Sequence, residues 1–532
     1  MNDAPGRPPR LVLGLALLVP ALLAWLYSYV LPTVSTVSGS LHGGPEGEDR
    51  DWVGFDNYDA LGDAGFGQAL WLTVIPLFVV WVIAPTLAWA ATRAGTTARL
   101  VTLGGLALPM AAFAPIGLAV GWFVSRWERP DELTRDLDTL STVLWLTTFG
   151  FVCGVAVTCY LVAMRRRSIN AGLAMAALLT IVTVAAALQV YGYPQVVNAS
   201  VYGDEPLSPT AAAAEYVTYR YEFGPAQAIG TLQLLLLALL GLAATLLVTR
   251  ARLRLEFAGW RRTRADLQDP APGFPRGEGW GTTLVLLAGV LALTLYGIWP
   301  WLRPTLGLTV GELPEGRSAA QIVAHGWLPP LVGTIVAVGI ALLGGFAIGG
   351  LRPLGERSEL LLLPFAPWLF VGVGPMMVSL FERTRDLEQI DTWAGLVPPG
   401  WVSIPALYVF TLLFRGLGAG WRERGTGLGR DVLLPALPMV ALLGGLVWVL
   451  RAQDLLWPNL VAPRFDQYPA AALVILQHDS YTPTGQISLG LLTPLPLLIA
   501  LALGLLALQL TYVERLTLVS DTKEPEPGPG WF

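Results

Sequence analysis

Charge is the scarcest feature of this sequence. Only 13% of its 532 residues are Asp, Glu, Lys or Arg, whereas soluble domains carry about 25%. Hydrophobic residues make up 54% of the chain, and its mean hydropathy is +0.58. So few charges cannot cover a soluble surface, which excludes soluble enzymes, disordered proteins and nucleic-acid binders; no nucleic-acid partner is expected. The composition predicts an all-α integral membrane protein in a lipid bilayer.

Residues that carry chemistry are scarce as well. The single lysine, Lys523, does not follow a Gly-rich loop, so the chain has no P-loop for ATP hydrolysis. The three histidines lie far apart in the sequence, which excludes a local histidine metal motif. Cys153 and Cys159 are six residues apart on one predicted helix and so face different ways, which disfavours a disulfide. We expect no catalytic residue, metal or cofactor, and therefore no enzyme.

Long apolar runs occupy most of the chain. A membrane span needs about 20 apolar residues, and windows of about 19 residues locate twelve candidate runs. Six lie in each part of the chain, before and after a polar stretch at 250–279. The predicted spans are Leu11–Leu31, Ala69–Ala91, Leu100–Ser125, Thr139–Met164, Ala171–Gly192, Ala226–Thr249, Trp280–Trp301, Pro329–Gly350, Leu360–Phe381, Pro399–Phe414, Leu433–Arg451 and Ser488–Val513.

The distribution of charge fixes the expected orientation. With a cytoplasmic N-terminus, basic residues concentrate on the inner segments, led by Arg165–Arg167 and the arginines from Arg250 to Arg264. Acidic residues concentrate on the outer segments. This distribution follows the positive-inside rule. Twelve spans then place both termini in the cytoplasm.

The two sets of spans resemble one another. Gln189–Val196 (QVYGYPQV) parallels Gln453–Val461 (QDLLWPNLV), and Gly224–Gly230 enters the sixth span as Gly485–Gly490 enters the twelfth. An even number of spans gives both halves the same orientation, so we expect two parallel six-helix repeats with a substrate path at their interface. The predicted units are a first half (1–268), a Pro/Gly-rich linker (269–279), a second half (280–515) and a disordered tail (516–532).

The predicted spans hold almost no ionisable side chains. Ion-coupled carriers usually keep such groups inside their spans, where they bind the coupling ion. Here every acidic residue falls in a loop or at a span edge, and Arg415 and Arg451 lie near an interface to which arginine can snorkel. An uncharged interior suits a neutral substrate and indicates that the driving energy comes from outside the membrane.

Short motifs resemble those of carbohydrate ABC-importer permeases. Trp52–Leu61 (WVGFDNYDAL) with Phe66–Thr73, and Tyr221–Gly230, are similar to segments of one permease of such systems. Leu433–Pro438 and Leu455–Pro469 are similar to segments of its partner permease. The resemblance implies two fused permease units in the plasma membrane of a bacterium, importing a sugar or another neutral polar solute. It also implies cytoplasmic ATPase subunits and an extracytoplasmic solute-binding protein as partners.

The cytoplasmic loops depart from the family. Permeases of this family carry a Glu-Ala-Ala…Gly loop that docks on the ATPase, whereas Arg165–Asn170 is too short for one. Gly416–Asp431 has nearly the length but lacks the motif. It is either an altered coupling loop or a solvated Gly-rich turn. The residues that would contact an ATPase are Trp421, Arg422, Glu423, Gly425, Gly427, Leu434 and Pro435.

Other interpretations remain open. A permease-derived scaffold or regulator would have lost its ATPase. A glycosyltransferase-like enzyme would use carboxylates of the acidic outer loop, Glu46 to Asp63, although the glycines of that loop indicate flexibility. Aromatic rings stack on sugars, so the deep aromatic residues are either substrate contacts or helix packing; the candidates are Trp145, Tyr191, Trp368 and Trp448.

Overall fold

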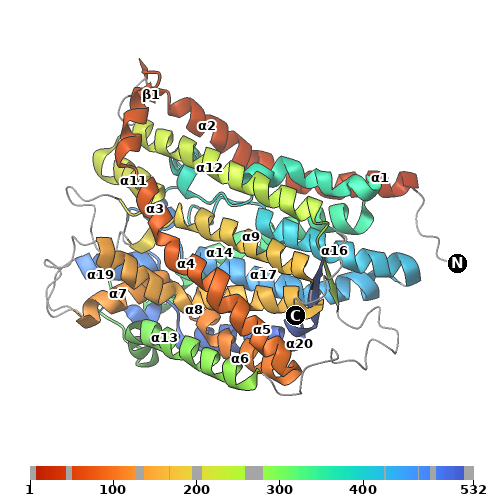
Figure 1. The fold of residues 1–532 in the computed structure, drawn as a ribbon. Coiled ribbons are helices and arrows are strands. Elements are labelled where there is room, and N and C mark those ends of the chain that lie inside the picture. The colour runs from red at the N-terminus through yellow and green to blue at the C-terminus, as the bar shows by residue number, and fades with distance from the viewer. Residues whose placement is uncertain are drawn as a thin grey trace.

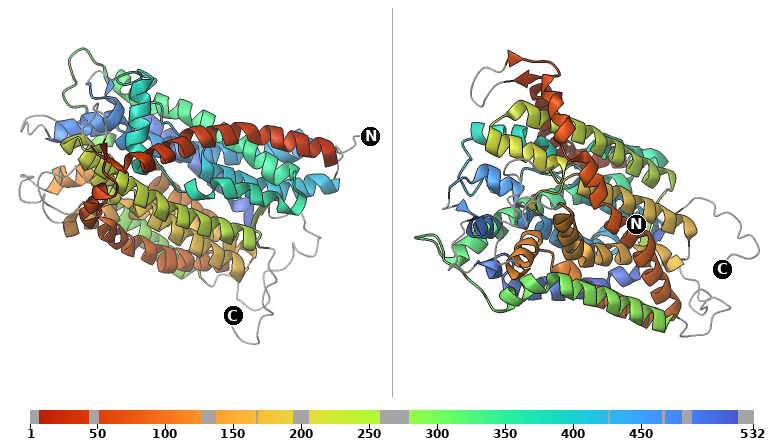
Figure 2. Two further views of the ribbon diagram at one scale, coloured as in Figure 1. Left: turned by 90° about the horizontal axis from the view of Figure 1, so that it is seen from above. Right: turned by 60° about the vertical axis from the view of Figure 1, so that its left-hand side comes forward.

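The structure is a computed structural model, and long helices dominate it (Figure 1). It describes residues 7–43, 51–126, 137–166, 168–193, 206–257, 279–424, 427–464, 467–479 and 487–520. In both views of Figure 2 the long helices run roughly parallel to one another, as the spans of a membrane bundle do. The chain is an all-α membrane protein, as its composition predicts. Two short strand pairs are the remaining regular structure of the described residues.

The first half consists of helical segments, each followed by a turn or a loop. Its first segment continues from α1 through a π-helical turn into α2, because no charged residue interrupts the apolar run from Leu11 to Gly39. The elements of this half are α1 (Arg7–Trp25), η1 (Leu26–Val30), α2 (Leu31–Gly39), β1 (His42–Gly43), β2 (Asp51–Trp52), η2 (Asp56–Asp63), α3 (Phe66–Leu72), α4 (Val74–Phe78), η3 (Val79–Ile83), α5 (Ala84–Ala94), α6 (Thr96–Ala111), α7 (Pro115–Arg126), α8 (Leu137–Ala163), η5 (Met164–Arg166), α9 (Ile169–Ala187), α11 (Pro209–Glu215), η6 (Tyr216–Arg220), α12 (Phe223–Arg250) and β3 (Arg254–Phe257).

The second half begins with two 27-residue helices and then becomes less regular. A capping box at Ser318 and Gln321 starts the second of these helices. The elements are α13 (Trp280–Leu306), α14 (Ala319–Gly345), η8 (Phe346–Leu351), η9 (Gly355–Trp368), η10 (Gly374–Met376), α15 (Met377–Asp386), α16 (Ile404–Arg424), η11 (Gly429–Leu433), α17 (Leu434–Ala452), α18 (Leu456–Val461), α19 (Ala470–Asp479), η13 (Leu489–Leu491), α20 (Leu495–Thr511), η14 (Val513–Arg515) and β4 (Leu516–Val519).

The described residues contain nine helices that are long and apolar enough to cross a membrane, or ten with one bent pair. The bent pair is α6 and α7, so the single helix expected over Leu100–Ser125 is wrong: the chain turns by 75° at 112–114. Pro109 and Pro115 flank this break, and proline weakens the helical hydrogen bonds around it. The total of twelve spans, the cytoplasmic termini and the division into halves stay predictions, and we keep "first half" and "second half" as labels.

The expected span Leu360–Phe381 is also not a regular helix. Residues Gly355–Trp368 form a 3₁₀ helix, η9, and an irregular segment at 369–373 follows before η10 and α15. Pro364 and Pro367 cannot donate the backbone hydrogen bonds of an α-helix. The tenth expected span, Pro399–Phe414, overlaps α16 only from Ile404 onward, and the apolar part of α16 covers Ile404–Gly418.

Elements of each half pack against elements of the other half. The first segment of each half packs on the second segment of the other: α1 on α14, and α13 on α5. The last segment of each half packs on the third segment of the other: α12 on η9, and α20 on α6. We call these last two contacts the η9 seam and the α6 seam. One large cluster of buried apolar residues runs through both halves.

A second link between the halves lies beyond the ends of α12 and α20. Strand β3 pairs with β4 in antiparallel register, from Arg254 opposite Val519 to Phe257 opposite Leu516. The predicted tail boundary at 516 is therefore wrong, because residues 516–519 form an ordered strand. The linker at 269–278 and the chain from 521 onward lie outside the described residues.

Candidate functional site

The deep tryptophans named as path candidates do not come together. Each indole N–H donates a hydrogen bond to a different partner at 2.9 Å. These pairs are Trp145 with the carbonyl of Leu72, Trp368 with the hydroxyl of Thr33, and Trp448 with the carbonyl of Trp327. Each ring also packs edge-on or tilted against another tryptophan, respectively Trp71, Trp25 and Trp327. These contacts are those of helix packing.

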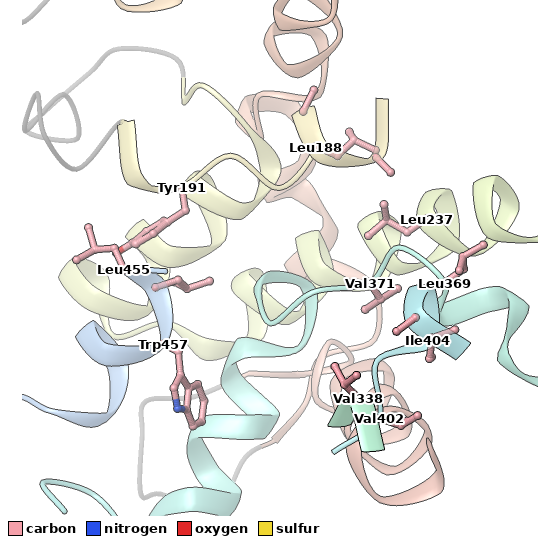
Figure 3. Packing of buried hydrophobic residues seen from close by; sticks show 14 of the residues in the cluster. Leu188, Tyr191, Leu237, Val338, Leu369, Val371, Val402, Ile404, Leu455 and Trp457 are labelled. Carbon is pink, nitrogen blue, oxygen red and sulfur yellow. The ribbon is translucent and has the colours of Figure 1, made fainter. Parts of the chain in front are cut away.

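Tyr191, like Trp368, lies between the halves. Its hydroxyl accepts a hydrogen bond from Nδ2 of Asn459, at 3.4 Å. Figure 3 places its ring beside Leu455 in the second half. Burial raises the pKa of the Tyr191 phenol above its ordinary value, so the phenol stays neutral. The two motifs that resemble each other in sequence thus meet at this contact.

Gln189, next to Tyr191 in the chain, binds backbone of the other half. Its Nε2 donates to the carbonyl of Phe370 at 2.8 Å, and its Oε1 accepts the N–H of Gly372 at 2.7 Å. Phe370 and Gly372 lie in the irregular segment between η9 and η10, so these two peptide groups need partners outside a helix. One amide side chain therefore satisfies both peptide groups at the interface.

A second amide, which is fully buried, lies beside the partly buried Gln189. Nε2 of Gln233, on α12, donates to the carbonyl of Leu188 at 2.7 Å and to the Thr210 hydroxyl at 2.9 Å. Its Oε1 has no hydrogen-bond partner although Gln233 is fully buried. On the same helix, neither polar atom of the Gln227 side chain has a partner, and that residue is 2% exposed. Unpaired buried amides are costly, so each calls for an explanation.

Apolar side chains lie around the irregular segment that Gln189 binds. Figure 3 shows Leu237 of α12 facing Leu369 and Val371 of the irregular segment, with Ile404 of α16 nearby. All four are buried in the same cluster. We call Gln189, Gln233, Thr210 and the backbone of 370–372 the amide site. It is polar and carries no charge.

The amide site was not predicted from the sequence. Ionisable groups and aromatic rings mark functional residues inside spans, and glutamine has neither a charge nor a ring. The available signal is the presence of glutamine in or next to apolar helices, where an amide requires partners.

Both arginines assigned to snorkelling bind other parts of the protein. Arg415 is 9% exposed, and its Nη1 lies 2.8 Å from Oε1 of Glu359. Nη2 of Arg451 donates to the carbonyl of Gly400 at 2.6 Å, while its Nη1 is buried without a partner. Both arginines thus bind atoms of the protein, and snorkelling stays a prediction.

A small polar cavity adjoins Arg451. It has a volume of about 10 Å³, room for about one water molecule, and its polar lining comes from His325, Arg451 and Asp454. Burial raises the pKa of Asp454 to about 6, despite hydrogen bonds from the backbone of the next three residues. This cavity is too small for a sugar.

The expected coupling loop is mostly helix. Helix α16 continues through Arg424, so Trp421, Arg422 and Glu423 lie on its last turns rather than in a loop. Trp421 packs against the main core, and the side chains of Arg422 and Glu423 are outside the described set. Gly425 also lies outside the described residues, and Gly427 is exposed. A Gly-rich loop over the whole of 416–431 is therefore wrong.

The two remaining coupling residues begin α17. The side chain of Leu434 is 62% exposed, and the carbonyl of Pro435 accepts a hydrogen bond from the hydroxyl of Tyr512 at 3.0 Å. The coupling residues that the structure describes thus flank a short connection between α16 and η11.

The acidic outer loop lies partly outside the described residues, including Glu46, Glu48 and Asp49. Among the residues that are described, no group of three His, Cys, Asp or Glu side chains is placed to hold a metal ion.

Comparison with known proteins gives no match: no protein-family model, no curated protein and no solved structure is similar to this chain.

Proposed function

We propose that this chain is the transmembrane permease subunit of an ABC-type importer for a sugar or another neutral polar solute. The observation that carries the proposal is the amide site, an uncharged polar site at the interface of two interlocked halves. Solute would pass between the halves when they separate.

The chemistry of the amide site suits hydroxylated solutes. A glutamine side chain offers two N–H donors and one carbonyl acceptor, and each sugar hydroxyl can both donate and accept. The unpaired Oε1 of Gln233 is an acceptor that such a hydroxyl would satisfy. A charged solute would lack a counter-ion there, because no ionisable side chain belongs to the site.

The chain has no P-loop, so the driving energy would come from cytoplasmic ATPase subunits. They would dock near Gly427 and Leu434, where α16 and α17 approach each other. A solute-binding protein would deliver solute at the opposite face, in the plasma membrane of a bacterium. The alternative is a scaffold or regulator, favoured by the helical continuation of α16 in place of a coupling loop.

Uptake by cells tests the permease function. We expect that deleting the gene abolishes uptake of at least one radiolabelled neutral sugar or polyol. That uptake should stop on ATP depletion and persist with a protonophore. Gln233→Leu should reduce it at least tenfold, whereas Gln509→Leu, on α20 in the α6 seam, should leave it within twofold. Concentration of solute by vesicles holding only this chain, driven by protons or sodium, would contradict the proposal.

Photo-crosslinking tests the ATPase partner. A photoreactive residue in place of exposed Gly427 should form an adduct with a protein that contains a P-loop, identified by mass spectrometry. The same residue at Phe55, exposed next to the β1–β2 strand pair of the opposite face, serves as the control and should not. Absence of an ATPase adduct, together with unchanged uptake after gene deletion, would support the scaffold instead.

A further inference from the structure

The strand pair β3–β4 joins the ends of the two halves. Leu255 lies opposite Leu518, Glu256 opposite Thr517 and Phe257 opposite Leu516. The sequences Arg254–Phe257 (RLEF) and Arg515–Leu518 (RLTL) occupy equivalent positions after the last helices. If these two sequences are treated as equivalent, the pairing is symmetric about Glu256 and Thr517. The two strands are therefore related by a local twofold axis.

Helix α16 lies directly against this strand pair. A Cβ added at Gly416 would collide with the carbonyl oxygen of Leu255. Only glycine therefore permits this approach of helix and strand. At the other end of the pair, the hydroxyl of Ser520 donates to the carbonyl of Ala251, at 2.9 Å, which again joins one tail to the other.

One buried ion pair fixes β3 to the second half. Nη1 of Arg415, on α16, lies 2.8 Å from Oε1 of Glu359, on η9. The same Nη1 donates to the carbonyl of Leu253 at 3.2 Å, immediately before β3. Both charged side chains are about nine-tenths buried, at 10% and 12% exposure.

A second ion cluster fixes β4 to the first half. Oε1 of Glu514, two residues before β4, lies 3.1 Å from Nη1 of Arg165 and 4.0 Å from Nε of Arg99. Nη2 of Arg99 also donates to the carbonyl of Leu161 at 3.3 Å. The Glu514 side chain is 12% exposed and that of Arg99 is 8% exposed.

These two clusters are equivalent by position. Each joins the start of the third segment and the end of the fourth segment of one half to the chain that follows the last segment of the other half. In the second half these positions are Glu359 and Arg415; in the first half they are Arg99 and Arg165. Each cluster therefore holds the opposite half.

We propose that β3, β4 and the two ion clusters form a clasp that closes one end of the solute path and must part before the path opens there. The inference rests on the proposed permease function. Two paired strands alone are marginally stable in water, so the clasp depends on its ion clusters. Buried ion pairs lose much of their stabilisation once one partner moves, which suits an all-or-none contact. The arginines at this end place it in the cytoplasm by the positive-inside rule.

A disulfide across the clasp tests this role in transport. In a chain with Cys153 and Cys159 replaced by alanine, Leu255→Cys with Leu518→Cys joins directly opposed positions. The control pair is His42→Cys with Trp52→Cys, which are also opposed but belong to one half. Oxidation should reduce uptake at least tenfold in the clasp variant, reversibly with dithiothreitol, and leave the control unchanged. Unchanged uptake in the oxidised clasp variant overturns the proposal while the permease function stands.

Hydrogen–deuterium exchange tests the clasp without transport. In purified full-length protein, Glu514→Gln should speed exchange at least tenfold in both β3 and β4, and Glu359→Gln should do the same, because the strands open together. Glu215→Gln, which removes an ion pair with Arg220 outside the clasp, should change neither strand. Exchange that rises only in the strand next to each substitution overturns the clasp. If exchange follows the prediction and no variant transports, the joint opening of β3 and β4 stands, while the permease function and the role of the clasp in transport fail.

Discussion

The η9 seam and the α6 seam occupy equivalent places between the halves but are built differently. In the η9 seam, α12 approaches the partner backbone so closely that a Cβ at Gly241 would collide with the carbonyl oxygen of Ala366. In the α6 seam, side chains separate the helices. A Cβ added at Gly104 would lie 3.4 Å from a methyl group of Leu506. One seam is formed by backbone and the other by side chains.

The difference follows from the third segments. A 3₁₀ helix rises about 2.0 Å per residue, so the 14 residues of η9 extend about 28 Å, against about 21 Å for an α-helix. A 3₁₀ helix is also thinner, which lets α12 come closer. Helix α6 keeps α-helical geometry and a wider surface. The halves therefore share their topology but differ at their interfaces. The amide site lies at the η9 seam, beside the peptide groups of 370–372.

Replacing one glycine in each seam should give the largest difference in stability between the two interfaces. Gly241→Ala forces a Cβ against a backbone oxygen, and overpacking of this kind costs about 3 kcal/mol. At Gly104, on α6 in the other seam, an added Cβ would meet a Leu506 methyl group at 3.4 Å, an ordinary van der Waals distance, so Gly104→Ala should be neutral or stabilise by up to about 1 kcal/mol. Thermal unfolding in detergent micelles measures both. Equal effects would show that the seams do not differ.

Sequence reasoning located most helices because it rests on apolar run length, which the bilayer imposes. It was wrong at Leu100–Ser125 and Leu360–Phe381, where prolines alter helix geometry without changing hydropathy. A hydropathy window averages over Pro364 and Pro367 and cannot report a 3₁₀ helix. The strand at 516–519 was missed because its partner, β3, lies some 260 residues away in sequence.

The candidate site was harder to predict. Tyr191 was predicted as a candidate because of its aromatic ring, and it does lie between the halves. Its neighbour Gln189, which binds the other half, was not predicted. The role of Gln189 depends on two peptide groups at 370–372, and these are free only because η9 ends at Trp368. No local sequence pattern reports such a long-range requirement.

The paired glutamines should show a smaller difference. Gln189→Leu leaves the carbonyl of Phe370 and the N–H of Gly372 without their partner, and we expect a loss of about 2 kcal/mol. Gln453, at the parallel position, makes longer bonds within its own half, to Leu492 and Thr493 at 3.4 and 3.1 Å, so Gln453→Leu should cost about 1 kcal/mol. Unfolding in micelles measures both losses of stability. A larger loss for Gln453→Leu would contradict the claim that the hydrogen bonds of Gln189 between the halves are the stronger ones.

Asp454 gives the smallest and most specific test, because the first half has Val190 at the parallel position. The pKa of this carboxyl is raised to about 6 from 3.8, so the folded protein binds the proton more tightly than the unfolded chain does. Stability should therefore fall as the pH rises from about 4 to 6, by up to roughly 2 kcal/mol. Asp454→Asn removes this dependence, so its melting temperature should change less than that of the wild type between pH 4.5 and 6.5. Parallel pH profiles for the two proteins would mean that the carboxyl is not protonated in the folded state and that its cavity is open to water.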